Sequence, residues 1–439
     1  MTSPSHSADQ NLTLRESARI MFGASRAYWL VNLVNFGDGI AYFGILNLLT
    51  LFIHDQLGLT DHYTGIAVSF FTGAVTLFMF FGGFLSDRLG VRKALMVSLL
   101  LLLIGRVFLT SSPLFDATGV LLWSSLALMA LGTGVLQPTL YAGAKEFSDP
   151  RTSAISYSLV YAIMNFGIMI ESFMSPYIRE HGGIEAVFWT MAAVNGVVLL
   201  AILLLFTKKV EDRDRVVEVA PVPAEQVSLG QKIKALPILD ARFMAFIFVL
   251  LPVRTMFAHQ WLTMPHYIMR CFPESVGSRY EWFQALNPLI ITIAVPLVAA
   301  LTRKVNIISM MVVGTVISAA STFILSPAPD VTLLILYILV FSMGEAIWSS
   351  RFFEYVAELA PAGRVGAYMG LAGIPWFLAK FTTGFYSGLM LEAFIPEHGA
   401  QNSGMLWTVY GLIALASPLG LLLTRKWMAG GHKQAGATA

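Results

Sequence analysis

The chain contains little charge and almost no cysteine. Only 12% of its 439 residues are Asp, Glu, Lys or Arg, whereas soluble domains carry about 25%. The single cysteine, Cys271, excludes an internal disulfide and a metal centre built from cysteines, and we expect no metal and no other cofactor. The net charge of +2 gives no indication of a nucleic acid partner. These deficits argue against an ordinary soluble domain.

Hydrophobic residues are correspondingly abundant, at 56%. They gather in runs of about 20 residues, the length that a membrane-spanning helix needs. The first run is too long for a removable signal peptide, so we expect it to remain as the first helix. The sequence therefore predicts an all-α, multi-pass protein of the cell membrane, the inner membrane if the cell is bacterial, with the lipid bilayer as its surroundings. The twelve predicted spans are 28–53, 64–86, 93–112, 117–143, 153–178, 185–207, 241–270, 280–302, 306–326, 331–358, 365–391 and 402–427.

Basic residues in the loops, in the tails and at the ends of these spans are distributed very unevenly. If both termini are cytoplasmic, 21 of them lie in cytoplasmic segments. The opposite side then carries three, namely Arg179, Arg270 and Arg279. Because cytoplasmic loops of membrane proteins are rich in Lys and Arg, we predict that both termini are cytoplasmic.

The longest polar loop divides the chain into two halves. Residues 208–240 are charged and contain proline, and we interpret them as a cytoplasmic linker between six-helix bundles at 28–207 and 241–427, with tails at 1–27 and 428–439. The halves resemble each other: LALMALGTGVLQPTL in the first corresponds to YILVFSMGEAIWSS in the second. Duplicated halves are typical of alternating-access transporters, whose substrate site lies at the midplane between them.

The loop GFLSDRLGVRK, residues 83–93, resembles the cytoplasmic signature GxxxDRxGRR of the major facilitator superfamily. The residue at the first of the paired arginines is Val91, a departure from the pattern. The resemblance implies that superfamily's fold, with twelve transmembrane helices, and a cytoplasmic gate in which Asp87 latches one conformational state. The alternative is a turn whose arginines only follow the charge rule for cytoplasmic loops. The matching residues are Gly83, Asp87, Arg88, Gly90 and Arg92.

Further stretches together resemble the proton-coupled oligopeptide transporters. VYAIMNFGI, residues 160–168, is similar to that family's FYxxINxGS signature and keeps Tyr161, Asn165 and Gly167. EWFQALNPLIITIAVPL and FSMGEAIWSS are similar to its helices 8 and 10. The resemblance implies symport of small peptides with protons, and it implies that Glu345 binds the amino group of the substrate.

The first helix departs from the family pattern. NFGDGIAYFG, residues 35–44, lies where the family has ExxERFxYYG, so Asn35 and Asp38 stand at two glutamates and Gly39 at an arginine. Gln137 stands at a helix 4 lysine, and His259 precedes Gln260 where an acidic residue is usual. These replacements leave one negative charge where the family set sums to zero.

Asp38 is therefore predicted to be a protonatable residue that needs a partner, because a carboxylate in a medium of low dielectric constant is costly. One partner is Arg254 of the second half; the alternative is that Arg254 neutralises Glu345. Glu345 and His259 are further candidates for proton coupling, although a lone histidine can equally be a hydrogen-bonded wall residue. We expect Glu171 to pair with Arg106, and the alternative is a role for Glu171 in an extracellular gate.

The remaining candidates are substrate contacts. Lys380 can take a substrate carboxylate or extend its ammonium out of the helix bundle, and the aromatic side chains can line a cavity or pack between helices. The candidate substrate-binding residues are Asn35, Tyr42, Gln137, Tyr161, Asn165, Arg254, Gln260, Glu345, Trp348 and Lys380.

The interpretation is a secondary active transporter, not an enzyme, that works by alternating access. It is expected to be a monomer that carries small peptides, or peptide-like or amine-bearing solutes, together with protons. Two alternatives stay open. One is a proton-driven exporter of lipophilic or cationic compounds, and the other is a receptor-like member of the fold that does not transport.

Overall fold

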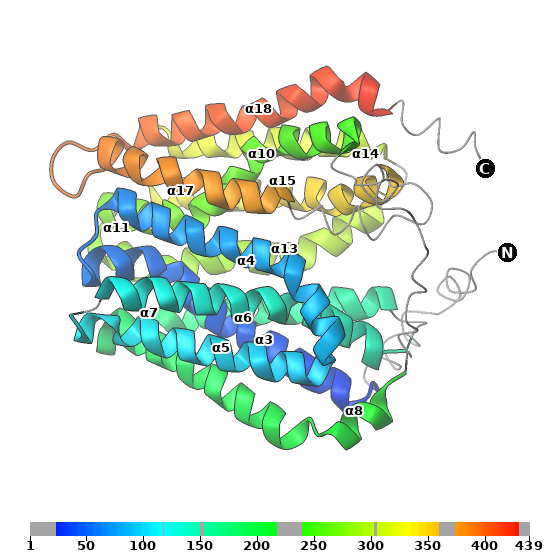
Figure 1. Cartoon of the computed structure of the whole chain (residues 1–439). Helices are drawn as coiled ribbons and strands as arrows, with labels where there is room; N and C mark the ends of the chain where they lie inside the picture. The colour runs from blue at the N-terminus through cyan, green and yellow to red at the C-terminus, as the bar shows by residue number, and fades with distance from the viewer. Residues whose placement is uncertain are drawn as a thin grey trace. The chain divides into compact units, whose positions relative to one another are not determined.

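The computed structural model describes residues 23–116, 118–149, 153–216, 239–302, 305–359 and 374–429. In these ranges the chain is built from helices, most of them long enough to cross a bilayer (Figure 1). They are α3 (Arg26–Leu51), η1 (Phe52–Gln56), α4 (Asp61–Leu89), α5 (Val91–Ser111), η2 (Ser112–Leu114), α6 (Thr118–Phe147), α7 (Ser153–Leu205), α8 (Lys208–Asp214), α10 (Ala241–Leu262), α11 (Met264–Cys271), α12 (Glu274–Gly277), α13 (Tyr280–Leu301), α14 (Ile307–Ser321), η5 (Thr322–Leu325), α15 (Val331–Leu359), α17 (Ile374–Phe394) and α18 (Ser403–Ala429).

The predicted spans correspond to these helices. Within the described residues, nine segments are long and apolar enough to cross a membrane. One of them, Leu159–Leu205, covers two predicted spans. These spans are the two parts of α7 on either side of a break at Gly183, where φ is 71°. Glycine adopts this backbone conformation without steric cost. The other two predicted spans correspond to α13 and to α17, which begins at Ile374 because part of the predicted 365–391 lies outside the described residues.

One predicted span was wrong in its extent. The run 241–270 was expected to be a single helix, but α10 ends at Leu262 and a separate helix, α11, begins at Met264. Pro265 stands at the start of α11, where its missing N–H costs nothing, whereas within a continuous helix it would remove a hydrogen bond.

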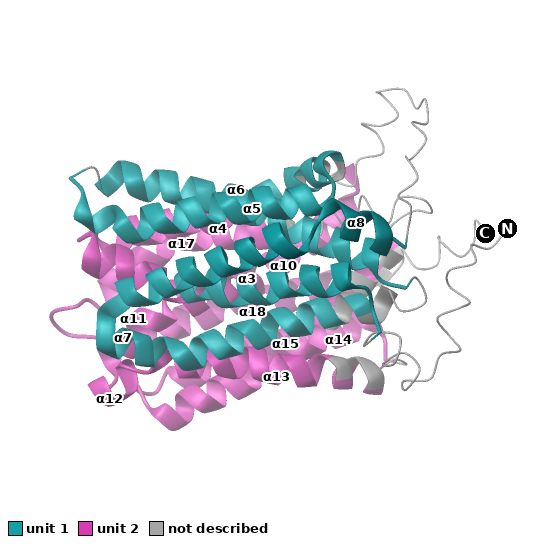
Figure 2. Cartoon of the chain, turned by 90° about the horizontal axis from the view of Figure 1, so that it is seen from below, with its two compact units in different colours: residues 1–46, 77–223 teal, residues 47–76, 224–439 magenta. Residues whose placement is uncertain are grey.

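The chain forms two compact units (Figure 2). Unit 1 comprises residues 1–46 and 77–223, and unit 2 comprises residues 47–76 and 224–439. The boundary after residue 223 falls in the predicted 208–240 linker, whereas residues 47–76 group with the carboxyl-terminal part of the chain. The division into six-helix bundles at 28–207 and 241–427 stays a prediction.

Close backbone contacts hold the helices of each unit together. In unit 1, a Cβ on Gly39 of α3 would lie 2.6 Å from the carbonyl oxygen of Met164 in α7. In unit 2, a Cβ on Gly344 of α15 would lie 2.6 Å from the backbone nitrogen of Ser318 in α14. Small residues permit such close packing of helices in membranes. These crossings position the polar residues of each unit.

Candidate functional site

A buried ion pair lies in the interior of unit 1. Asp38 of α3 is 5% exposed and Arg106 of α5 is 1% exposed. The Nη2 group of Arg106 donates a hydrogen bond to Asp38 Oδ1 at 3.4 Å, and Gln137 Nε2 of α6 donates to Asp38 Oδ2 at 3.2 Å. Arg106 Nη1 donates to Asn195 Oδ1 of α7. We call Asp38, Arg106, Gln137 and Asn195 the unit 1 cluster.

The ion pair corrects the expected partner of Arg106, which contacts Asp38 and Asn195 instead of Glu171. Arg106 also supplies the positive charge that is missing from the first helix. The four motif positions sum to minus one, and Arg106 brings the sum to zero from a different helix. The signal for this role was present in LLLLLIGRVFL, an arginine within an apolar run, because a charge at such a position needs a partner.

The other unit 1 candidates lie where α3 and α7 cross. Asn35 Nδ2 donates to the carbonyl of Val160 at 2.6 Å, and Asn165 Nδ2 donates to the carbonyl of Tyr161 at 2.9 Å. The side chain of Tyr161 is exposed. Tyr42 follows Asp38 by one helical turn and interacts with it electrostatically. Asn35 and Asn165 therefore bind backbone carbonyls, while Tyr42 adjoins the ion pair.

Unit 2 contains a second polar cluster, built on α10, α13, α15 and α17. Glu345 Oε2 accepts a hydrogen bond from Asn287 Nδ2 at 2.8 Å. The same amide group donates to Ser342 Oγ at 2.9 Å. We call Arg254, Asn287, Glu345 and Lys380 the unit 2 cluster.

Its two cations lie against aromatic rings. The guanidinium carbon of Arg254, which is 2% exposed, lies 4.2 Å from the ring centroid of Phe352, 4.8 Å from Trp376 and 5.1 Å from Trp348. Lys380 Nζ lies 5.8 Å from the ring of Trp376. Cations are attracted to the faces of aromatic rings. Glu345 attracts Arg254 electrostatically, in agreement with the alternative in which these two residues neutralise each other.

His259 is buried in unit 2 and makes hydrogen bonds there. Its Nδ1 lies 2.8 Å from Thr263 Oγ1 and its Nε2 lies 3.2 Å from the hydroxyl of Tyr386. The ring also stacks on Tyr410, at 3.7 Å between centroids. The neighbouring Gln260 donates to the hydroxyl of Tyr337 at 3.1 Å. Both nitrogen atoms of His259 thus have hydroxyl partners.

The gate motif, expected to be a loop, covers the end of α4, the turn at Gly90 and the start of α5. Gly90 has φ 75° and directly precedes α5, a turn that favours glycine. Arg92 Nε lies 3.2 Å from Glu211 Oε2 of α8, an acidic partner that sequence reasoning missed. The motif also contains Gly83, Arg88 and Asp87, whose side chain lies outside the described ones. The latch role of Asp87 stays a prediction.

Known proteins resemble this chain over most of its length. A dipeptide and tripeptide permease A from Edwardsiella piscicida is 22% identical over 449 residues, which cover 88% of this chain and 89% of the relative. An uncharacterized MFS-type transporter, YttB from Bacillus subtilis, is 24% identical over 389 residues, 86% of this chain and 87% of the relative.

Solved structures show the same fold. The crystal structure of a peptide transporter POT in complex with alafosfalin matches with a TM-score of 0.75 and 18% identity, covering 98% of this chain and 99% of that one. A POT family transporter in complex with 5-aminolevulinic acid matches with a TM-score of 0.71 and 16% identity, over 93% and 97% of the two chains.

A family model decides the assignment. The model described as Major Facilitator Superfamily matches residues 31–384, which is most of the chain and includes both polar clusters and the gate motif. The predicted fold class is confirmed by this match and by the solved structures. The chain therefore belongs to the major facilitator superfamily of membrane transporters, with peptide permeases among its relatives and POT transporters among the structures that share its fold.

Proposed function

We propose that the protein is a proton-coupled transporter of small peptides, or of peptide-like or amine-bearing solutes, that works by alternating access. The observation that carries this proposal is the buried pair of Asp38 and Arg106, which offers one proton acceptor and one anion-binding group at the same place. The printed names of the relatives, which are peptide permeases and POT transporters, support the class of substrate.

The proton acts on the ion pair. When Asp38 is ionised, its Oδ1 accepts from Arg106 and the two charges cancel. When a proton binds a carboxylate oxygen of Asp38, the attraction ends and the guanidinium needs another anion. A substrate carboxylate has the charge and the planar geometry that arginine binds. Proton binding and substrate binding thereby favour the same state of the unit 1 cluster.

Glu345 supplies the opposite charge for a substrate ammonium. The neutral amide of Asn287 donates a hydrogen bond to Glu345. This hydrogen bond can remain when a substrate ammonium approaches the carboxylate. Lys380 and Arg254 are the cations of this cluster. We assign proton coupling to Asp38 in preference to His259, because both ring nitrogens of His259 face hydroxyl groups.

In the proposed orientation both termini lie in the cytoplasm. We propose that the protein is a monomer in the cell membrane, the inner membrane if the cell is bacterial. The orientation is tested with single cysteines in the 208–240 segment, introduced after Cys271→Ser removes the native thiol. An impermeant thiol reagent should label them in inside-out vesicles and leave them unlabelled in intact cells. Labelling from outside would overturn the orientation.

The coupling experiment uses purified protein in proteoliposomes with a labelled dipeptide. The parental protein should accumulate the dipeptide when the pH gradient drives protons inward. Asp38→Asn should exchange dipeptide across the membrane but fail to accumulate it, since the amide cannot change charge. Asp116→Asn, the same substitution at an exposed aspartate, is the matched control and should behave like the parent.

Two outcomes would overturn the proposal. Accumulation by Asp38→Asn at the parental level would show that Asp38 does not couple protons to transport. Counterflow of a lipophilic cation without any counterflow of dipeptide would identify the chain as an exporter of cations on the same fold.

A further inference from the structure

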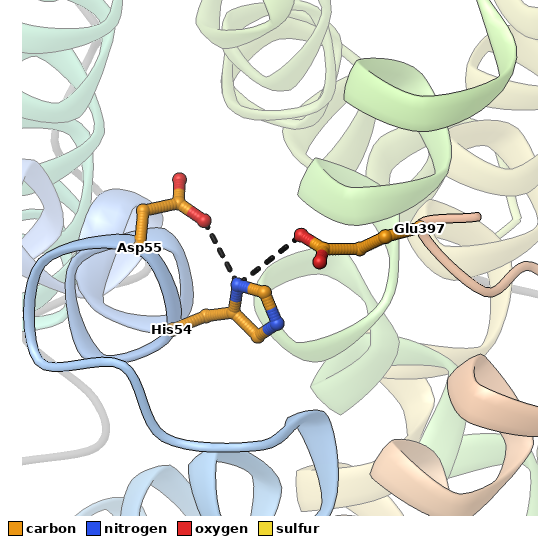
Figure 3. Close-up of side chains that lie close together, drawn as sticks. All are labelled: His54, Asp55 and Glu397. Carbon is orange, nitrogen blue, oxygen red and sulfur yellow. Dashed lines mark hydrogen bonds and ion pairs between the residues drawn. The ribbon is translucent and has the colours of Figure 1, made fainter.

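A second group of titratable side chains lies in unit 2, away from its polar cluster. His54 and Asp55 belong to η1, which continues α3, and Glu397 belongs to the loop between α17 and α18. One ligand atom from each of these three residues lies within 4.8 Å of the other two. Figure 3 shows both carboxylates directed at the same nitrogen of the imidazole. We call these three residues the His54 group.

The imidazole of His54 lies between carboxylates on both sides. Its Nδ1 is 2.9 Å from Asp55 Oδ1 and 3.6 Å from Glu397 Oε1. Its Nε2 is 3.4 Å from Asp61 Oδ1. A neutral imidazole carries one N–H donor and one lone pair. Whichever nitrogen carries the proton, the lone pair of the other nitrogen faces a carboxylate oxygen.

The two sides of the ring differ in charge. Asp61 is 6% exposed and accepts two hydrogen bonds from Arg270 of α11, at 2.7 and 2.9 Å, so its charge is already neutralised. Asp55 and Glu397 lie on the other side, where their side chains are 45% and 50% exposed. On that side Nδ1 makes a hydrogen bond with Asp55, so a cation bound to Nδ1 would replace that proton and leave the ring proton on Nε2, toward Asp61.

We propose that the His54 group binds one divalent transition-metal ion of the Zn²⁺ type. His54 Nδ1, Asp55 and Glu397 supply one nitrogen and two oxygen ligands, and water completes the coordination. A nitrogen ligand favours zinc and similar ions over Mg²⁺ and Ca²⁺, which prefer oxygen. Asp61 takes the role of the outer carboxylate that orients a metal-binding histidine through its second nitrogen.

The charge of the surroundings fits a divalent ion. Asp55, Asp61 and Glu397 contribute three negative charges and Arg270 one positive charge, so a divalent cation makes the group neutral. The buried His266 also faces this group, with its Nδ1 4.0 Å from Asp61 Oδ1. The exposure of Asp55 and Glu397 lets an ion enter from solvent. Bound metal would link η1 to the α17–α18 loop, a role independent of the proposed function.

From the sequence alone we expect no metal, because one cysteine cannot build a cysteine centre. The residues of the His54 group show no metal-binding motif either, since they stand at positions 54, 55 and 397. Only folding brings the three side chains together.

The test is calorimetric titration of ZnCl₂ into the full-length chain, purified in detergent with any affinity tag removed. We expect saturable binding of one ion per chain. Asp55→Asn and Glu397→Gln should each weaken it at least tenfold, and neither should unfold the protein because both side chains are exposed. With Co²⁺ as the probe, the visible absorption of a nitrogen-bound ion should be lost in His54→Gln.

His398→Gln is the matched control, because it removes an exposed neighbouring histidine that is outside the group. It should leave the affinity unchanged. The proposal is overturned if the parental protein shows no saturable binding. It is equally overturned if Glu397→Gln binds as tightly as the parent, or if His398→Gln weakens binding as much as Glu397→Gln does.

Discussion

The unit 1 cluster and the unit 2 cluster hold their buried charges in different ways. In unit 1 the cation and the anion bind each other directly, through Arg106 and Asp38. In the unit 2 cluster the charges are held mainly by neutral groups, with Arg254 against aromatic rings and Glu345 on the amide of Asn287. A direct pair is costly to break from one side, whereas charges held by neutral groups remain available to a ligand. Under the proposed function, the unit 1 pair exchanges the proton and Arg106 then takes the substrate carboxylate, while Glu345 of unit 2 takes the substrate ammonium.

The largest effect should come from removing one member of the direct pair. Arg106→Gln leaves the buried carboxylate of Asp38 without its cation and should lower the free energy of unfolding by about 3 to 5 kcal/mol. Arg254→Gln in unit 2 should cost only about 2 kcal/mol, the contribution of a desolvated cation–π contact. Thermal unfolding in detergent measures both.

The double variant Asp38→Asn with Arg106→Gln is the control for this contrast. It strands no charge, so it should recover most of the loss caused by Arg106→Gln alone. Equal losses for Arg106→Gln and Arg254→Gln would contradict the difference between the units.

The next effect concerns ligand affinity in unit 2. Glu345→Gln should weaken binding of an amine-bearing ligand by about 1.5 to 3 kcal/mol, since a charged hydrogen bond is lost. Stability should change little, because the new amide can still accept from Asn287. Titration with a dipeptide measures the affinity, and Glu274→Gln at an exposed position is the control. Unchanged affinity would remove Glu345 from the substrate site.

A third test asks what the units have in common. Gly39→Ala in unit 1 and Gly344→Ala in unit 2 each place a methyl group 2.6 Å from a backbone atom of the facing helix. Each should cost about 1 to 3 kcal/mol of stability, the usual effect of overpacking. Gly83→Ala meets no atom within 4 Å and should instead stabilise α4 by about 0.5 to 1 kcal/mol. A loss for Gly83→Ala similar to the other two would show that packing is not the cause.

The smallest effect lies outside the membrane-spanning helices, in unit 1. Asp214 Oδ2 accepts from the backbone nitrogen of Ala27 in the first turn of α3, and the hydrogen bond from Arg213 lowers the pKa of Asp214. A lowered pKa means that this contribution is present above the unfolded value, about 3.9, and is lost as the pH falls through the folded value.

Asp214→Asn should therefore cost about 1 kcal/mol or less at neutral pH and nothing at the acid end of this window. Unfolding measured from pH 6 to pH 3 checks the change. A constant difference between Asp214→Asn and the parent over this range would exclude the ionised carboxylate as its source.

The sequence predicted the helices better than the partners of the charges. Apolar runs predict helices, because a segment in lipid must form its backbone hydrogen bonds within itself. The end of α10 was missed because Thr263 and Pro265 interrupt a run that is still apolar on average. The pairing of Asp38 with Arg106 was missed because a buried charge shows that it needs a partner without showing which helix supplies it. The His54 group was missed for a similar reason, since its ligands come from distant parts of the chain.

The assignment of residues 47–76 to unit 2 has a consequence for cutting the chain. The polypeptide passes between the units three times, within α3, within α4 and after residue 223. A protease that cleaves the 208–240 segment removes only the third connection. The amino-terminal fragment would still carry the part of unit 2 that includes Asp61, hydrogen-bonded to Arg270 of the other fragment. Two separately expressed fragments should therefore co-purify, because residues 47–76 of the first fragment would bind the second.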